Sequence, residues 1–307
     1  MLNLPIWVRP GVQIPADPFS MSALRIKEII AKSILVPSKL PDCDYVVNPY
    51  TGCEFACKYC YASFMGRYVS EPIEQWGSYC YVKINAVELF REELAKMRKR
   101  GQAPSMLLSS VTDPYQGQEA KYQLTRGILG VLAEEPYPGE VSFLTKSPMV
   151  LRDVDLLMKL PHVEVGMTVT STDDAVSRFL EVSAPSATSR IHTLLELNKK
   201  GIKTYAFIGP LLPHFRYDPA GLEKIFSALK QAGVKEVYIE HINLSSYILK
   251  RLGEVLKDAS EETRQVYEKA ALEEHRKILN EMVIGLIKKY GLKLRMEKVL
   301  YHNEEKK

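Results

Sequence analysis

Three cysteines lie close together near the start of the chain, in the segment Asn48-Pro-Tyr-Thr-Gly-Cys53-Glu-Phe-Ala-Cys57-Lys-Tyr-Cys60-Tyr61. Thiolates are the usual protein ligands of iron–sulfur clusters. Three thiolates bind three of the four irons of a cubane and leave the fourth iron open to another ligand. The spacing therefore predicts a [4Fe–4S] cluster held by Cys53, Cys57 and Cys60, with one open coordination position.

Other uses of cysteine fit the sequence less well. A structural zinc site would take Cys43 or Cys80 as its fourth ligand, but zinc prefers paired C-x2-C units and the chain has no second pair. An electron-transfer ferredoxin needs a run of four cysteines, which is absent. Five cysteines in a long chain without a secretion signal do not suggest a disulfide framework. Zinc remains the main alternative from the spacing alone.

Composition narrows the class of protein. The 307 residues carry a net charge of +4, which only weakly indicates an anionic partner. No apolar run is long enough to cross a membrane, and the N-terminus has no apolar signal core. The sequence therefore predicts a cytoplasmic protein without a membrane partner.

Strand and helix patterns alternate through the middle of the chain. Gly201 and Gly233 stand where two of the helices should end in glycine caps. Asn85, with Glu88 three residues later, predicts the capped start of an earlier helix. The expected strands cover residues 106–111, 141–145, 163–170, 203–208 and 237–242, and the expected helices cover 124–134, 150–160, 189–200, 219–232 and 246–256.

Such units build a parallel sheet with right-handed crossovers. Six units fit, so an α/β fold with a partial (β/α)6 barrel is favoured over an eightfold one, and a flat doubly wound sheet is the alternative. Residues 1–41 predict an N-terminal extension that wraps the barrel core of residues 42–259. Residues 260–307 predict a C-terminal segment packed on the core, with a long helix over 260–290 and a strand over 293–301.

The cysteine run, with an aromatic residue before its third cysteine, resembles the signature of the radical S-adenosylmethionine (radical SAM) superfamily. Other segments, in the right order between about residues 34 and 241, resemble its spore photoproduct lyase-like branch, often labelled DNA repair photolyase. They are Asn48–Cys53, Thr112–Gln116, Leu144–Ser147, Leu180–Glu181, Ala184–Ser186 with Arg190, and Gly209–Pro210. The resemblance implies a TIM-like partial barrel with the cluster at the mouth of its first strand.

The resemblance also implies an enzyme of lyase or oxidoreductase type that uses a [4Fe–4S] cluster and S-adenosyl-L-methionine (SAM). In the superfamily, an electron from the cluster cleaves SAM to methionine and a 5′-deoxyadenosyl radical, which abstracts hydrogen from a substrate. The protein supplies binding, orientation and shielding from water. The implied partners are an unidentified substrate, for which nucleic acid is one candidate, and an electron donor such as flavodoxin or ferredoxin.

Five residues are carried over from the resemblance as cofactor contacts. Tyr59 matches the aromatic residue near the adenine, and Lys146 matches the lysine that meets the cofactor carboxylate. Thr168 would hold the methionine carboxylate or the ribose, and Thr112 and Asp113 would face the same mouth. Each residue type also has an ordinary structural use, as a packing aromatic, a solvated lysine, a strand threonine or a turn carboxylate.

Tyr61 and Ser110 are the expected catalytic positions. Spore photoproduct lyases carry a cysteine after the second strand that returns hydrogen to the repaired thymine, and alignment puts Ser110 in its place. A serine O–H bond is too strong for a ready hydrogen-atom donor, and Tyr61 matches a tyrosine of the same relay. Repair of a DNA lesion is therefore the alternative function, and a non-catalytic metal or cluster-binding module is the third. Glu181 and Arg190 are expected to form a structural pair.

Overall fold

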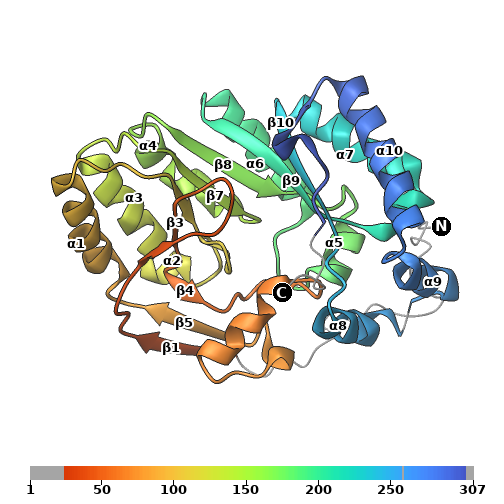
Figure 1. Cartoon of the computed structure of the whole chain (residues 1–307), viewed down its shortest axis with the longest axis horizontal. Coiled ribbons are helices and arrows are strands. Elements are labelled where there is room, and N and C mark those ends of the chain that lie inside the picture. The colour runs from red at the N-terminus through yellow and green to blue at the C-terminus, as the bar shows by residue number, and fades with distance from the viewer. Residues whose placement is uncertain (1–23, 258, 302–307) are drawn as a thin grey trace.

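An eight-stranded sheet forms the body of the protein in the computed structural model, which describes residues 24–257 and 259–301 (Figure 1). From one edge to the other, its strands are β11 (Lys293–Leu294), β10 (Glu236–His241), β9 (Lys203–Leu211), β8 (Val163–Thr168), β7 (Val141–Thr145), β6 (Met106–Leu108), β3 (Tyr45–Val47) and β2 (Leu35–Pro37). All neighbouring strands from β3 to β11 are parallel, and β2 runs antiparallel to β3. Among the described strands, the edges β2 and β11 do not pair with each other, so this sheet does not close into a full barrel.

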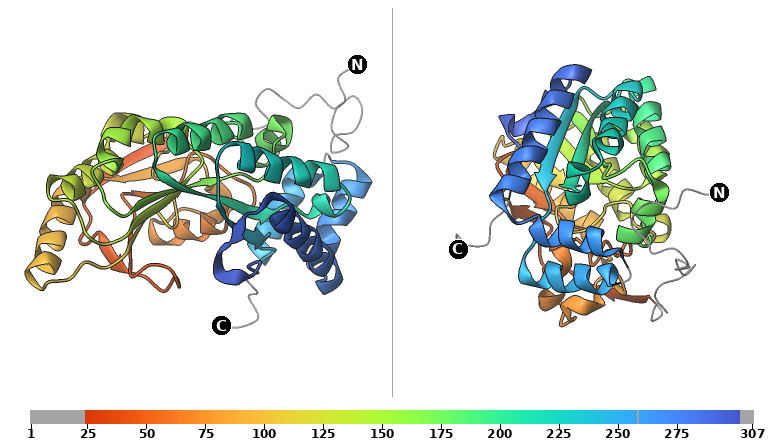
Figure 2. Two further views of the ribbon diagram at one scale, coloured as in Figure 1. Left: turned by 90° about the horizontal axis from the view of Figure 1, so that it is seen from above. Right: turned by 90° about the vertical axis from the view of Figure 1, so that its right-hand side faces the viewer.

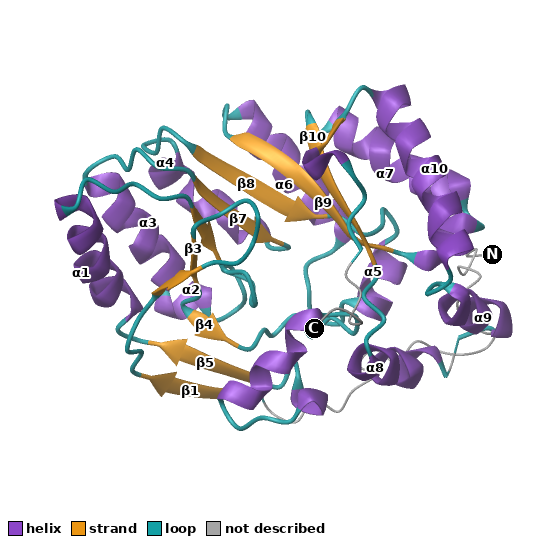
Figure 3. Ribbon diagram, viewed as in Figure 1, coloured by secondary structure: helices purple, strands orange, loops and turns teal. Residues whose placement is uncertain are grey.

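Most of the helices cover the outer side of the curved sheet (Figure 2). The helices are α1 (Ala86–Lys99), α2 (Glu119–Tyr122), α3 (Leu124–Glu134), α4 (Val154–Leu157), α5 (Asp174–Leu180), α6 (Ala187–Lys199), α7 (Pro219–Gln231), α8 (Ser246–Leu256), α9 (Glu261–Lys269) and α10 (Glu273–Tyr290). Of these, α5 and α8 contact the cysteine segment. Strands such as β9 are buried along nearly their whole length, as expected for parallel strands covered by helices. The alternation of strands and helices in Figure 3 confirms the predicted partial (β/α)6 barrel.

A second, three-stranded sheet positions the cysteine segment. β5 (Tyr79–Lys83) lies between β1 (Arg25–Ile29), which is parallel to it, and β4 (Tyr50–Thr51), which is antiparallel. The chain leaves β4 through Gly52, whose φ is +91° and whose added Cβ would lie 2.4 Å from the Tyr79 carbonyl oxygen. Only glycine allows both the backbone conformation and this close approach, which bring the chain directly to Cys53.

Most expected elements are confirmed, although the strand expected over 106–111 ends at Leu108, and three further elements differ more. Residues 148–157 form a 3₁₀ segment, η3 (Pro148–Asp153), followed by the short α4, in place of one helix over 150–160. The expected helix over 260–290 is interrupted by a turn between α9 and α10. Tyr267 of α9 and Leu279 of α10 are both buried. The expected strand over 293–301 is limited to β11 and an isolated bridge, because Met296 adopts a positive φ of 59° between them.

The predicted helix caps are confirmed at two helix ends and not at the start of α1. Gly201 and Gly233 follow α6 and α7 with φ of +76° and +84°, which confirms the predicted glycine ends. Asn85 precedes α1 but does not cap it, so that prediction was wrong in mechanism. Its side chain instead accepts a hydrogen bond from the Ala31 N–H and donates one to the Ala31 carbonyl, which ties α1 to the segment after β1.

The predicted ends of the chain are only partly described. Residues 24–41 of the expected extension contribute β1 and β2, whereas residues 1–23 and 302–307 lie outside the described residues. The division into extension, core and C-terminal segment stays a prediction. In the described part of the chain, no helix combines the length and the apolar character that a membrane span needs.

Candidate functional site

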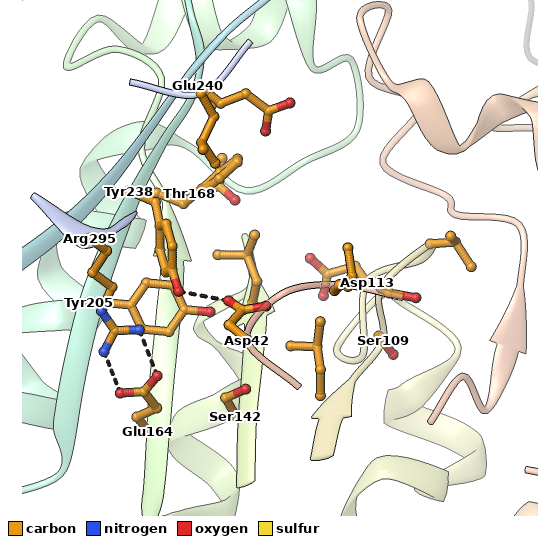
Figure 4. A pocket seen from close by; sticks show the side chains of 18 of the residues that line it. Asp42, Ser109, Asp113, Ser142, Glu164, Thr168, Tyr205, Tyr238, Glu240 and Arg295 are labelled. Carbon is orange, nitrogen blue, oxygen red and sulfur yellow. Dashed lines mark hydrogen bonds and ion pairs between the residues drawn. The ribbon is translucent and has the colours of Figure 1, made fainter. Parts of the chain in front are cut away.

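A cavity of about 1120 Å³ runs through the barrel along the strands. Its upper end lies where the parallel strands end, and is lined by the three cysteines of the motif together with residues such as Lys146 and Thr168. Its lower end lies where the strands begin, and is lined by residues such as Glu164 (Figure 4). Ligands of open parallel sheets bind at the carboxyl ends of strands, which makes the upper end the candidate site.

The three cysteines converge on this upper end as free thiols. Cys53 and Cys57 are buried and Cys60 is half-buried, and none forms a disulfide. Burial raises the pKa of all three thiols, that of Cys57 to about 12, and the charges of Cys57 and Cys60 further raise the pKa of Cys53. Binding of a metal group would therefore release protons from them.

The donor set fits a cubane with an open iron. Among residues 24–257 and 259–301, no three or more His, Cys, Asp or Glu side chains are grouped to hold a single metal ion. Three thiols without a fourth protein ligand are the set that leaves one iron of a [4Fe–4S] cluster open. Cys43 lies elsewhere, where its thiol donates to the Ser38 hydroxyl at 3.2 Å.

Hydrogen bonds hold the cysteine loop from two sides. From the barrel side, the Gly52 carbonyl accepts from the Thr112 hydroxyl at 2.6 Å and from the Gln116 amide at 3.2 Å. From α8, the Arg251 guanidinium donates to the carbonyls of Cys57 and Cys60, at 2.9 and 3.4 Å. The backbone of the loop is therefore fixed by side chains that are distant in sequence.

Lys146 and Tyr59 belong to a charged network beside the thiols. The Tyr59 hydroxyl donates to the Glu181 carboxylate, which is also paired with Arg190, and this confirms the expected Glu181–Arg190 pair. The Lys146 ammonium lies 5.9 Å from the centroid of the Tyr59 ring. Burial alone would lower the pKa of Lys146, but the charges of Cys57 and Glu181 raise it, so Lys146 is a cation at the upper end.

The other expected cofactor contacts also line the cavity, and some have structural partners. Asp113 is buried, and its carboxylate accepts from the Thr145 hydroxyl at 2.6 Å and from the Lys146 N–H at 2.8 Å. Thr112 holds the cysteine loop, as described above, and Thr168 ends β8 with its side chain buried. Their contacts with a cofactor, like those of Tyr59 and Lys146, stay predictions.

The structure brings Tyr61 and Ser110 together. The Tyr61 hydroxyl donates to the Ser110 carbonyl at 2.5 Å. Asn48 fixes the same turn, because its side-chain oxygen accepts from the Ser110 N–H at 3.0 Å and its amide donates to the Ser110 hydroxyl at 3.4 Å. Both residues line the cavity near the cysteines, and their catalytic use stays a prediction.

The lower end of the cavity was not identified from the sequence. Arg295 lies between the carboxylates of Glu164 and Glu236, with contacts of 2.6 and 2.7 Å, and covers the rings of Tyr205 and Tyr238 (Figure 4). These residues come from β8, β9, β10 and the segment after β11. No local motif marks them, since only the sheet order brings these strands together.

Comparison with known proteins shows the family of the chain. The family described as the radical SAM superfamily matches residues 47–219. The chain belongs to the radical SAM superfamily. The protein MJ0683 of Methanocaldococcus jannaschii is 37% identical over 225 residues, which are 73% of this chain and 80% of that protein. The protein Rv2578c of Mycobacterium tuberculosis is 27% identical over 280 residues, covering 86% of this chain and 81% of that protein.

Solved structures share the fold. Spore photoproduct lyase in complex with a dinucleoside spore photoproduct superimposes with a TM-score of 0.65 at 16% identity, over 90% of this chain and 82% of the lyase. SuiB of Streptococcus suis, bound to S-adenosylmethionine, gives a TM-score of 0.52 at 11% identity, over 84% of this chain and 47% of SuiB. At these identities the comparison supports the fold of the barrel.

Proposed function

We propose that this enzyme binds a [4Fe–4S] cluster through Cys53, Cys57 and Cys60 and uses it to cleave SAM reductively. The observation that carries the proposal is the convergence of three free thiols and the Lys146 cation at the upper end of one large cavity. Membership of the radical SAM superfamily and the fold shared with SuiB, whose structure holds SAM, support it. The lower part of the same cavity would hold the substrate.

The residues around the thiols would bind and orient the cofactors. When bound, the cluster and SAM would supply a one-electron cleavage that yields a 5′-deoxyadenosyl radical. Lys146 would attract a carboxylate, and the Tyr59 ring would form an apolar wall. Asp113, Thr112 and Thr168 would offer oxygen atoms to the remaining polar groups. The buried setting of the thiols would keep water and unwanted hydrogen donors away.

Product analysis tests this proposal. After anaerobic reconstitution with iron and sulfide, the protein should form 5′-deoxyadenosine from SAM when dithionite supplies electrons. Chromatography with mass detection measures that product against a sample without dithionite. If the fully loaded protein forms no 5′-deoxyadenosine, the proposal is contradicted.

Replacing Lys146 should weaken SAM binding. In Lys146→Met the chain length is similar but the cation is lost, and a hydrogen bond to a charged group contributes roughly 1.5–3 kcal/mol, or about 10- to 150-fold in Kd. Equilibrium binding of SAM to the loaded protein measures the effect. Lys203→Met is the control, because Lys203 lies at the lower end and pairs with Glu164. An equal Kd for SAM in both variants would contradict a role of Lys146 in SAM binding.

DNA lesion repair is the second candidate, motivated by the fold shared with spore photoproduct lyase. Two observations weigh against it. Ser110 cannot readily return hydrogen, and the described cavity lining holds more carboxylates than cations, whereas nucleic-acid sites use Lys and Arg to neutralise phosphates. The carboxylates are Asp42, Asp113, Glu140, Glu164, Glu236, Glu240 and Glu297, and the cations are Lys146, Lys203, Lys293 and Arg295. Release of thymine products from a lesion-bearing dinucleotide by the reduced enzyme would establish repair, and their absence excludes it.

A further inference from the structure

A buried arginine from α8 reaches the cysteine loop. Arg251 lies on the same helix stripe as Ile248 and Leu252. All three residues are buried, and Arg251 is only 9% exposed. A charge on an apolar stripe is costly unless it has strong partners. The position lies outside residues 47–219, which match the superfamily, so the family motif does not account for it.

The partners of Arg251 are the backbone carbonyls of two proposed cluster ligands. Its two terminal nitrogens donate to Cys57 at 2.9 Å and to Cys60 at 3.4 Å. In the described parts of the chain, no carboxylate lies within ion-pair distance of Arg251. Lys146 and Arg190, two other cations beside the thiols, both interact with the negative charge of Glu181.

The rest of α8 holds the helix against the same loop. The Tyr247 hydroxyl donates to the carbonyl of Tyr61, the residue after Cys60, at 3.2 Å, and Lys250 pairs with Glu74 at 2.9 Å. The Tyr247 contact places α8 against the start of the 3₁₀ segment η1 (Tyr61–Tyr68), which follows the cysteines. Both contacts come from the helical turn that precedes Arg251, and they hold this part of α8 beside the loop.

We propose that Arg251 is a positioning residue that fixes the backbone of Cys57 and Cys60 and eases reduction of the cluster. The inference rests on the proposed function, because it assumes that these thiols hold the cluster. Adding an electron increases the negative charge of the cluster, and a nearby buried cation with no carboxylate within ion-pair distance stabilises the reduced form. The side chain thus acts through both geometry and charge.

The test is an anaerobic redox titration followed by EPR, without SAM, on the reconstituted full chain. Arg251→Gln should lower the equilibrium constant for reduction of the cluster about tenfold or more. For one electron, this corresponds to a midpoint potential about 59 mV more negative. Arg251→Lys keeps the charge but cannot span two carbonyls, so its potential should stay near that of the wild type while its iron content falls. Lys257→Gln removes an exposed cation just after α8, where it pairs with Glu254, and should change neither value.

The possible results distinguish the role of Arg251 in cluster reduction from its role in positioning. A wild-type potential in Arg251→Gln overturns the role in reduction, and full iron content in both Arg251 variants overturns the role in positioning. If Arg251→Gln retains no cluster although circular dichroism shows it folded, positioning is supported, and the potential of Arg251→Lys then decides the electrostatic part. A wild-type protein that takes up no iron–sulfur cluster contradicts the proposed function itself, which is a different result from all of these.

Discussion

Cys57→Ala should yield a folded protein that has lost both the iron–sulfur absorbance and the formation of 5′-deoxyadenosine. Cys57 is the middle ligand of the three, and its thiol lies buried near Lys146 and Cys60. With two thiolates left, the cubane loses one of its three anchors and the site can no longer hold it in place. Iron content, visible absorbance and 5′-deoxyadenosine yield after anaerobic reconstitution measure the loss, which should reach the detection limit.

The matched control is Cys43→Ser. Cys43 is also a free, buried thiol, but it contacts Ser38 and does not line the cavity. This variant should keep its iron and its activity. The assignment of the ligands is wrong if Cys57→Ala retains iron and SAM cleavage at the level of the control.

Breaking the buried Glu181–Arg190 pair should destabilise the protein by about 3–5 kcal/mol, because it leaves a charge buried without its partner. Arg190 and Glu181 are 0% and 1% exposed. Burial alone would raise the pKa of Glu181, but the charges of Arg190 and Lys146 lower it to about 2, so the carboxylate is ionised at neutral pH. Arg190→Met removes its main partner, and denaturant unfolding of the unloaded protein measures the loss.

Two comparison variants make this prediction specific. Arg91→Met breaks a pair with Glu134 on the surface and should leave the free energy of unfolding nearly unchanged, since exposed pairs contribute little. Glu181→Met combined with Arg190→Met removes both charges and should recover part of the stability. If Arg190→Met unfolds at the same denaturant concentration as Arg91→Met, the buried pair does not stabilise the fold as described.

Local patterns in the sequence were sufficient for the barrel and for the cysteine loop. The strand over 141–145 and the helices over 124–134 and 246–256 match β7, α3 and α8, because their apolar periodicity and flanking turns are local signals. The three cysteines are adjacent in sequence, so their spacing alone indicates shared ligation.

Features built by distant parts of the chain could not be predicted in this way. Arg251 meets a carbonyl of Cys57, 194 positions away, and Arg295 pairs with Glu164, 131 positions away. The only local signal was an arginine within the apolar stripe of α8, which could have marked Arg251 as buried. Asn85 was misread because a capping sequence does not reveal a competing tertiary partner such as Ala31.

The open iron position is tested most directly by EPR of the reduced, anaerobically reconstituted protein before and after addition of SAM. We expect about four irons and about four sulfides per chain, and a spectrum that changes when SAM occupies the position that the three thiols leave free. One zinc per chain without iron or sulfide, or a cluster spectrum that saturating SAM leaves unaltered, would contradict an open cubane at Cys53, Cys57 and Cys60.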